Sequence, residues 1–223
     1  MVTGWMPQAL AQAPASFDLA RLTPGRDSFA ILVQGAQIGA TVTVTERVGD
    51  GVRITDRTAV AGLIDQTTVI ETGPGGRMRR VSQQGTIQGQ DASIEVGYTR
   101  GRVTGTARTI GPEGPVTVAI DTAVADGTVD DNAVQGLIPA LTWGGGSSWS
   151  LPVFSAAQNE SRATTLTVMG TESVALATGP TEAFRVHWTG AWQEATFWVS
   201  VAVPHRVLRI AVAGTPLDIV RVP

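Results

Sequence analysis

A strict two-residue alternation of side-chain character is the feature that most constrains this chain. In TVTVTERV, from Thr41 to Val48, threonine alternates with valine before charged residues follow, and VRITDRTAV resumes the pattern after Gly49-Asp50-Gly51. Successive side chains of a β-strand point to opposite faces, so a period of two indicates a strand with two unlike faces. Two such runs joined by a short Gly/Asp loop predict a β-hairpin.

The same pattern recurs along the chain. TTVIET ends at GPGG (Gly73 to Gly76), ASIEVGYTR ends at Gly101, and GPEG (Gly111 to Gly114) leads into PVTVAIDT. Turn residues at this spacing are typical of a meandering antiparallel sheet with one polar and one apolar face. In the C-terminal part we expect strands at Trp149–Phe154, Thr164–Met169, Glu172–Ala177, Ala183–Thr189, Ala191–Val201, His205–Ala213 and Leu217–Val222.

One segment departs from this rhythm and predicts a helix. In DGTVDDNAVQGLIPALTW the apolar residues fall at i, i+3, i+4 and i+7, which is one face of a helix. These residues are Val134, Leu137, Ile138 and Leu141. Asp130, Asp131 and Asn132 are each good N-caps, and Gly136 and Pro139 weaken the helix interior. We therefore expect a short or kinked helix at about Asp130–Leu141, which either links two small β domains or, as we prefer, crosses the open end or the concave face of one sheet.

The fold class follows from these elements. Hydrophobic residues make up 43% and charged residues 16% of the 223 residues, which is enough apolar material for a folded core. We predict a mainly β protein, an antiparallel meander forming an incomplete or half-open barrel, with residues 21–223 as a single β domain. Residues 1–20 are interpreted as a disordered leader or the remnant of a signal peptide, because Ala9-Leu10-Ala11 is similar to the small-x-small end of such a signal.

Composition excludes several classes of function. The chain has no cysteine, which excludes disulfides and thiolate chemistry, and its two histidines argue against a multi-histidine metal site. The net charge of −3, with arginines scattered along the chain, gives no electrostatic footprint for nucleic acid. A run of about 18 apolar residues is absent, so no membrane-spanning helix is expected. We predict neither a cofactor nor a metal.

Aromatic residues provide the candidate binding site. Five of the six tryptophans lie between Trp143 and Trp198, and the even spacing of Trp192 and Trp198 puts both on one face of the expected strand Ala191–Val201. Such a cluster is either the aromatic wall of a ligand cavity or a stripe of the core or of an interface. The candidate ligand-binding residues are Trp143, Trp149, Trp188, Trp192, Phe197 and Trp198.

His205 and Arg206 are the polar candidates for the site. Pro204 precedes them and favours a turn or strand start, where polar residues are common. The sequence GGGSSWS lacks the final glycine of a nucleophile elbow, so it offers no partner for a catalytic histidine. The acids Asp126, Asp130 and Asp131 lack calcium-loop spacing and are better explained by helix capping. We assign no catalytic residue.

Several segments resemble a known family. LIPALTWGGGSSWSLPVF, VMGTESVALATGPTEAFRVHW and ATFWVSVAVPHRVLRI together resemble the DUF3108-type proteins, and LTPGRDSFAILVQGAQIGATVTVTERV resembles their opening hairpin. These are exported bacterial β-proteins, similar in shape to the LolA-like half-barrels that hold lipid acyl chains. The resemblance implies an incomplete barrel partly closed by the helix, an apolar ligand, and a periplasmic or extracellular location. It transfers no catalytic residue.

Three hypotheses for function follow. The first is a non-catalytic cell-envelope binding protein that holds a lipid or other apolar ligand in the concave face of a half-barrel. The second is a structural or partner-binding module in envelope assembly, which predicts a filled interior and an exposed apolar edge. The third is an enzyme acting in the same cavity, whose mark would be a buried carboxylate or histidine with a perturbed pKa beside the tryptophans.

Overall fold

The computed structural model describes residues 13–223, which form one 16-stranded sheet with a short helical segment. The N-terminal strands are β1 (Ala13–Pro14), β2 (Gly25–Val33), β3 (Ala36–Val48), β4 (Gly51–Val60), β5 (Ile64–Thr72), β6 (Met78–Ile87), β7 (Gln90–Thr99), β8 (Arg102–Gly111) and β9 (Gly114–Ala123). The others are β10 (Val129–Asp130), β11 (Ser148–Ser155), β12 (Glu160–Leu176), β13 (Gly179–Thr189), β14 (Ala195–Ser200), β15 (Val207–Val212) and β16 (Leu217–Val222).

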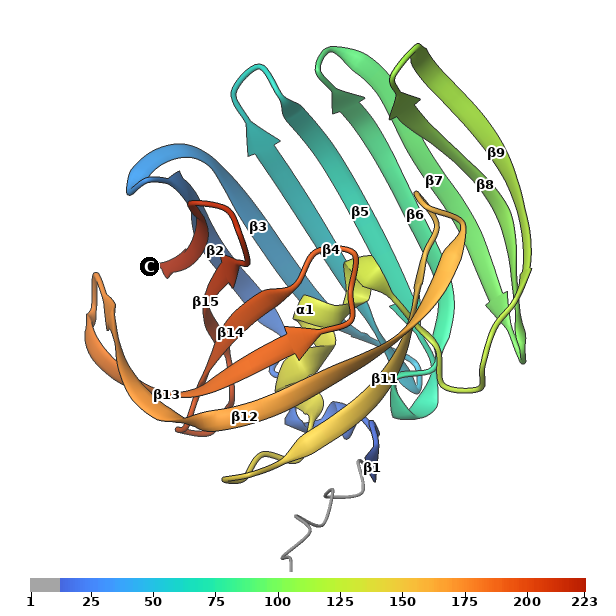
Figure 1. Ribbon diagram of the computed structural model, residues 1–223. Coiled ribbons are helices and arrows are strands. Elements are labelled where there is room, and N and C mark those ends of the chain that lie inside the picture. Colours follow the sequence, from blue (N-terminus) through green and yellow to red (C-terminus); the bar gives the residue numbers. More distant parts are fainter. Residues whose placement is uncertain (1–12) are drawn as a thin grey trace, which may run out of the picture.

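The sheet is a meander in two halves. Strands β2 to β9 pair in chain order, as do β11 to β16, and all of these pairs are antiparallel. The last strand, β16, pairs with β2 and so joins the halves, whereas β9 and β11 are not paired with each other in the described part of the chain. The sheet therefore curves without closing, as Figure 1 shows. This confirms the predicted incomplete barrel of antiparallel strands.

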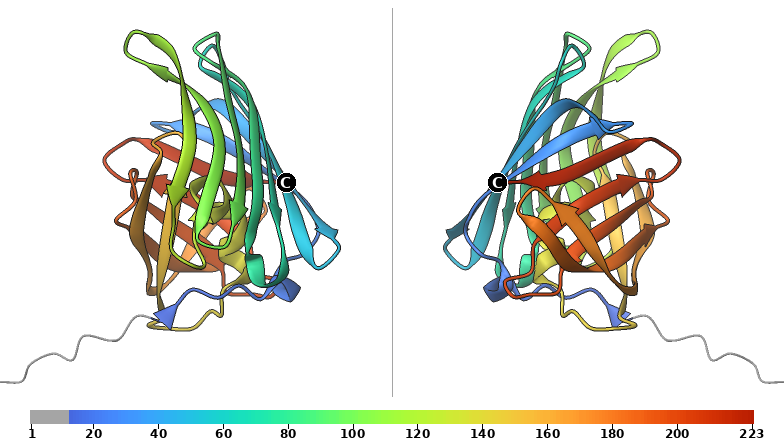
Figure 2. Two further views of the ribbon diagram at one scale, coloured as in Figure 1. Left: turned by 90° about the vertical axis from the view of Figure 1, so that its right-hand side faces the viewer. Right: turned by 90° about the vertical axis from the view of Figure 1, so that its left-hand side faces the viewer.

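The strands of the two halves extend to different heights. In the side views of Figure 2 the strands of the N-terminal half, coloured cyan to green, extend past the C-terminal half. The helical segment lies toward the opposite end, between the halves. One end of the concave face is thus closed by the helical segment, and the other end is bounded only by strands.

The helical segment is a chain of three short turns. A 3-10 turn at Asp131–Ala133 leads into α1 (Val134–Leu137), and a second 3-10 turn follows at Ile138–Ala140. The Asp130 side chain accepts a hydrogen bond from the Asn132 backbone N–H, 3.0 Å away, and so caps the start. The predicted short helix at about Asp130–Leu141 is confirmed, and Asp130 is the one of the three N-cap candidates that caps it.

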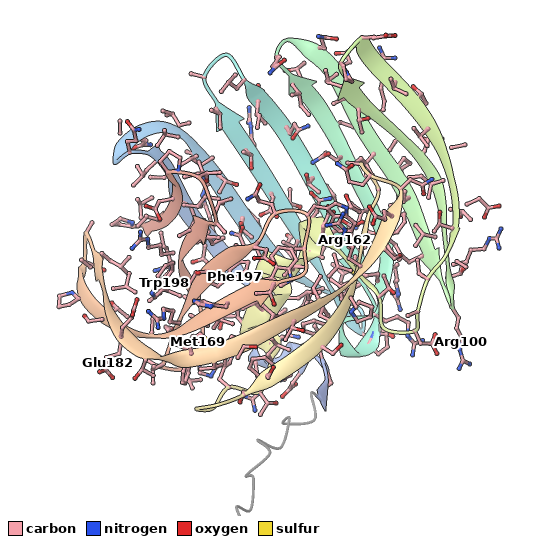
Figure 3. All side chains as sticks on the ribbon, viewed as in Figure 1. Arg100, Arg162, Met169, Glu182, Phe197 and Trp198 are labelled. Carbon is pink, nitrogen blue, oxygen red and sulfur yellow. The ribbon has the colours of Figure 1, made fainter. Side chains whose placement is uncertain are left out.

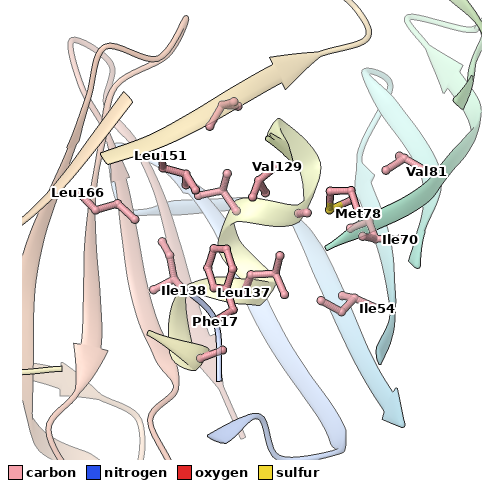
Figure 4. Packing of buried hydrophobic residues seen from close by; sticks show 14 of the residues in the cluster. Phe17, Ile54, Ile70, Met78, Val81, Val129, Leu137, Ile138, Leu151 and Leu166 are labelled. Atoms are coloured by element: carbon pink, nitrogen blue, oxygen red, sulfur yellow. The ribbon is translucent and has the colours of Figure 1, made fainter. Parts of the chain in front are cut away.

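The core lies between the helical segment and both halves of the sheet (Figure 4). Leu137 and Ile138 are almost fully buried, Leu137 near Ile54 of β4 and Ile138 near Leu166 of β12. A Cβ atom on Gly136 would lie 2.7 Å from Ile54 Cδ1, so glycine is what lets α1 approach β4 this closely. As expected, the helix covers the concave face and buries apolar surface that the curved sheet would otherwise expose.

One expected pair of strands is a single strand. We expected strands at Thr164–Met169 and Glu172–Ala177 with a turn at Gly170-Thr171, but β12 runs without a break from Glu160 to Leu176. The register against β13 shifts between Val168 and Gly170, and Gly170 takes a φ of 141°. The glycine therefore accommodates a β-bulge, which bends a strand without ending it.

In β3 the polar face, not the apolar face, is turned toward the interior, which is the reverse of a simple amphipathic sheet. Thr41 and Thr43 are buried toward the interior, while Val42 and Val44, at the other parity, are only partly buried. Thr43 pairs with Asp56 of β4, so polar side chains of these neighbouring strands lie on the same face of the sheet. Part of the concave face is consequently polar, whereas the alternation of the sequence predicted an apolar face there.

The N-terminal stretch joins the fold before residue 21. β1 pairs in parallel with β11, and Phe17 and Leu19 are buried in the core. Residues 1–12 of the stretch interpreted as a leader, including Ala9-Leu10-Ala11, lie outside the described residues. Residues 13–20 are ordered against the sheet, which differs from the expected disorder because Phe17 and Leu19 supply apolar side chains that the core takes up.

Candidate functional site

A cavity of about 350 Å³ lies in the concave face between the two halves of the sheet. Its walls come from β2 to β6 and β13 to β16, and α1 with the turn before it contributes Asp131, Asn132, Val134 and Gln135. We call this the central cavity. Its size is within the range of about 300–1,000 Å³ that is usual for small-molecule sites.

One wall of the central cavity is apolar. Trp188 of β13, Phe197 of β14 and Ile210 of β15 line it, with Ile219 of β16 and Ile31 of β2 beyond them. Neighbouring strands bring these side chains together: Phe197 pairs with Ile210, and Ile210 pairs with Ile219. The Trp188 and Phe197 ring centroids are 6.0 Å apart, and the Trp188 indole N–H donates to Thr164 Oγ1 at 3.0 Å. The indole is therefore held in place with its polar edge satisfied.

The facing wall, from β3 to β6, is mainly polar, with Ile64 as its apolar member. Its other lining residues carry hydroxyl, amide and carboxyl groups: Thr41, Asp56, Thr58, Gln66, Thr68 and Gln83. Thr58 Oγ1 donates to Thr41 Oγ1 at 2.8 Å, and Gln83 Nε2 donates to Thr68 Oγ1 at 2.9 Å. The central cavity is thus amphipathic, with an apolar wall opposite a hydrogen-bonding wall.

Asp56 is the member of the polar wall with an unmet bonding capacity. Its Oδ1 atom is buried without a hydrogen-bond partner among the described residues, and so is Oγ1 of Thr43, which pairs with Asp56 in the register. Burial raises the pKa of Asp56 from 3.8 to about 6, and the nearby Thr43 hydroxyl offsets a smaller part of that rise. A buried acceptor with no donor costs about 1–3 kcal/mol, more when charged, so this carboxyl is poised for a donor.

A second carboxyl lies at the helical end of the central cavity. Burial, followed by the charge of the adjacent Asp130, raises the pKa of Asp131 to about 8. Asp130 is fully buried and accepts hydrogen bonds from the Tyr98 hydroxyl and from Asn132. Burial raises the pKa of Asp130 as well. Asp130 and Asp131 are therefore an interacting carboxyl pair in which burial and mutual repulsion favour the protonated form.

The candidate aromatic residues are not brought together in one wall. Of the candidate residues, Trp188 and Phe197 line the central cavity. Trp143 and Trp149 do not line it and instead pack together elsewhere, with ring centroids 5.2 Å apart. Trp143 also stacks on Phe184 at 5.6 Å and an interplanar angle of 14°. This second group is part of the core rather than of the central cavity.

Trp192 and Trp198 do not share a strand face, contrary to the prediction. β14 begins only at Ala195, so Trp192 lies in the preceding loop, where its N–H donates to Glu160 and the Arg162 guanidinium sits 4.8 Å from its ring. Trp198 follows Phe197 on β14 and points to the other face (Figure 3). There it packs in a small cluster with Val174, Ala183 and Leu208.

His205 and Arg206 form structural contacts outside the central cavity. His205 Nδ1 donates to the Ser200 carbonyl at 2.8 Å. Arg206 and Arg221 both bind the Asp27 carboxylate, with Arg206 Nη1–Oδ2 at 2.8 Å and Arg221 Nη2–Oδ1 at 2.7 Å. The space that His205 and Arg206 line is only about 40 Å³, room for little more than water. Neither residue lines the central cavity.

Comparison with known proteins places the chain in a family. The profile of the family described as "Protein of unknown function (DUF3108)" matches residues 28–218. The chain belongs to the DUF3108 family. This confirms the resemblance seen in the C-terminal segments and in the opening hairpin.

One solved structure is similar to this DUF3108 protein in outline. It is the crystal structure of a beta-barrel-like protein of domain of unknown function DUF1849 from Brucella abortus, with a TM-score of 0.47 at 10% sequence identity. The alignment covers 90% of this chain and 95% of that chain. No curated protein matches the sequence.

Two further properties of this DUF3108 member concern metals and membranes. Within residues 13–223, no three His, Asp or Glu side chains are grouped so that they could hold a metal ion. Over the same residues, no helix has the length and apolar character needed to cross a bilayer.

Sequence reasoning missed the polar wall. On β4 the inward parity reads Val52, Ile54, Asp56, Thr58, Val60, so an aspartate interrupts an otherwise apolar face. A charged residue at an apolar parity is the signal that could have identified Asp56, because a buried charge is costly unless it has a role. Gln66 and Gln83 carry no comparable signal, since the sequences of their strands have polar residues at both parities.

Asp56 gives this DUF3108 protein a specific pH dependence. The unfolded chain releases the Asp56 proton near pH 4, whereas the folded protein holds it until about pH 6, so rising pH favours unfolding across this window. The variant Asp56→Asn should therefore gain stability relative to wild type, by up to about 3 kcal/mol, as the pH rises from about 4 to 6, and the gain should then level off. Urea unfolding at several pH values measures this difference.

Asp121→Asn is the matched control. Hydrogen bonding from Arg102 lowers the pKa of the exposed Asp121, so its variant should lose stability relative to wild type as the pH rises, and only slightly. Parallel curves for wild type and Asp56→Asn would contradict the assignment.

Proposed function

We propose that this DUF3108 member is a non-catalytic binding protein that holds an apolar or amphiphilic small molecule, such as a lipid, in its central cavity. The observation that carries the proposal is the cavity itself, a site of about 350 Å³ with Trp188 and Phe197 on one wall and hydrogen-bonding groups on the other. In keeping with the family resemblance, the proposal places the protein in the bacterial envelope, in the periplasm or outside the cell.

The two walls suit a ligand with an apolar body. Each methylene group that leaves water for the apolar wall contributes about 0.8 kcal/mol, so even a short alkyl chain gives measurable affinity. The polar wall then fixes the orientation of the ligand rather than adding much affinity, because its hydrogen bonds replace bonds to water. Gln193, an exposed lining residue, marks where the cavity meets solvent.

Native mass spectrometry of the purified protein, followed by delipidation and rebinding, tests the proposal. We expect a co-purifying apolar mass, or rebinding of a fatty acid, alcohol or phospholipid after delipidation. The variant Trp188→Ala should weaken that binding about tenfold, which corresponds to about 1.4 kcal/mol. Trp192→Ala, a tryptophan of similar partial burial that lies outside the cavity, should leave it within about twofold. No bound mass and no rebinding would refute the proposal.

A second candidate function is an enzyme acting in the same cavity. One observation favours it: Asp56 and Asp131 line the same cavity as Trp188, and burial raises the pKa of both. Perturbed carboxyls in a cavity are the groups that general acid–base catalysis uses. Hydrolysis of 4-nitrophenyl esters or glycosides that is lost in both Asp56→Asn and Asp131→Asn would support this candidate, and unchanged rates would remove it.

The partner-binding alternative fits the geometry less well. It predicts an interior filled with side chains, and the central cavity is a space of ligand size within the concave face. It remains a separate proposal, for which pull-down with envelope proteins is the test.

A further inference from the structure

Resting on the proposed function, we propose that the ligand is a cationic amphiphile, an amine with an apolar body, whose ammonium group binds the Asp56 carboxylate while its body lies on the Trp188 and Phe197 wall. Three features of the central cavity support this: an unpartnered carboxyl, the absence of a counter-ion, and the position of the apolar wall.

The first feature is the carboxyl group of Asp56. Its Oδ1 atom is buried and takes part in none of the geometrically defined hydrogen bonds within residues 13–223, although the Thr43 hydroxyl on the adjacent strand is near enough to lower the pKa of Asp56 slightly. Thr43 lines a separate small space, so Asp56 is the member of this pair that lines the central cavity. An ionised carboxylate accepts hydrogen bonds only, and an ammonium group in the cavity would give it a charge-assisted hydrogen bond, which is stronger than the bond from a neutral hydroxyl.

The second feature is the lack of a counter-ion. The same cross-strand row contains Asp27, which pairs with Thr43 from the other side, and this carboxylate is neutralised by Arg206 and Arg221. Asp56 takes part in none of the ion pairs formed within residues 13–223, and the residues lining the central cavity include no arginine, lysine or histidine. Nearby Arg53 lies at the opposite parity of β4 and pairs with Glu71.

This contrast between the two aspartates is informative. The Asp27 carboxylate is paired with two guanidinium groups and so contributes to the stability of the fold. The Asp56 carboxylate is largely buried but has no such partner among the residues that the structure describes. A buried charge without a partner is strongly unfavourable, so a cationic ligand provides what the protein leaves out.

The third feature is the apolar wall that faces Asp56 across the cavity. Phe197, Ile210 and Ile219 offer aliphatic and aromatic surface to the body of the ligand. A fatty acid would fit this wall equally well, but a carboxylate placed where the ammonium group would lie is next to the Asp56 carboxylate. Like-charge repulsion at Asp56 therefore discriminates against anionic amphiphiles.

Isothermal titration calorimetry with three probes of equal chain length tests the inference. The probes are octylamine, octan-1-ol and octanoate, titrated into the delipidated full chain at about pH 7.5, where the amine is cationic and most of Asp56 is ionised. We expect the amine to bind at least about tenfold more tightly than octanoate, with octanol between them. In Asp56→Asn the amine should lose about tenfold, and octanol should change by no more than about threefold.

Thr43→Val is the matched variant, because it removes the neighbouring hydroxyl and leaves the charge. It should retain the preference for the amine over octanoate, whereas Asp56→Asn should abolish it. Octanoate binding as tightly as octylamine to the wild-type protein would overturn the inference while leaving the proposed function intact. The wild-type comparison decides the matter even if a variant does not fold, and failure of all three probes to bind would count against both proposals.

Discussion

Replacing Gly105 by alanine is expected to destabilise the protein by about 2–5 kcal/mol, the sum of backbone strain and a steric clash. Gly105 lies in β8 with a φ of 149°, a conformation that residues with a side chain rarely adopt. An added Cβ would lie 2.0 Å from the Glu95 carbonyl oxygen and 2.8 Å from Val96 Cα, both backbone atoms of β7. Since neither can move without breaking the β7–β8 pairing, urea unfolding should show a marked fall in the free energy of unfolding.

Gly97 is the matched control for this substitution. It lies in β7, one residue from Val96, and a Cβ built on it would have no other atom within 4 Å. Gly97→Ala should therefore change the free energy of unfolding by less than about 1 kcal/mol. Equal losses at the two positions would contradict the view that the close approach of the β7 backbone requires glycine at position 105.

Leu137→Ala should have the other large effect, a loss of about 2–5 kcal/mol. Leu137 belongs to α1, is fully buried, and packs in the core between the two halves of the sheet. Truncation removes apolar contact and leaves a cavity that the surrounding strands cannot fill, because the sheet is held in register on both sides of the helix. Thermal or urea unfolding measures the loss.

Leu63→Ala is the matched control, because it is the same substitution at an exposed position. Leu63 lies in the turn between β4 and β5 and is 49% exposed, so the same substitution there should cost less than about 1 kcal/mol. A small loss at Leu137, comparable with that at Leu63, would show that the helical segment rests on the sheet without being part of the cooperative core.

Much of the fold follows from local patterns. Gly49-Asp50-Gly51 predicted the β3–β4 hairpin, and the apolar spacing from Val134 to Leu141 predicted the helical segment. Such signals depend on neighbours in the sequence, which is why they could be read without a structure. The bulge at Gly170 was mistaken for a turn because a glycine ends or bends a strand with the same sequence signal, and only the partner strand β13 distinguishes the two.

The candidate site was predicted only in part. Trp188 and Phe197 were assigned to ligand binding and line the central cavity, which fits that assignment without testing it. Trp143, Trp149, Trp192 and Trp198 lie elsewhere, because tryptophan serves core packing and cation contacts as readily as it serves ligands. Residue type and spacing cannot separate these uses, since each depends on which strands become neighbours.

By itself, the sequence determined the alternation in each strand, and hence that this chain forms antiparallel sheet with one short helix. It did not determine which parity faces inward. In β3 the threonines face inward rather than the valines, and this brings Thr43 next to Asp56 and Asp27 in one row. That choice is made by register and curvature across the whole sheet, because a shift of one residue would move every side chain of a strand to the other face. Tertiary structure therefore decides the polar wall of the central cavity, apart from Asp56, which interrupts the apolar parity of β4 in the sequence.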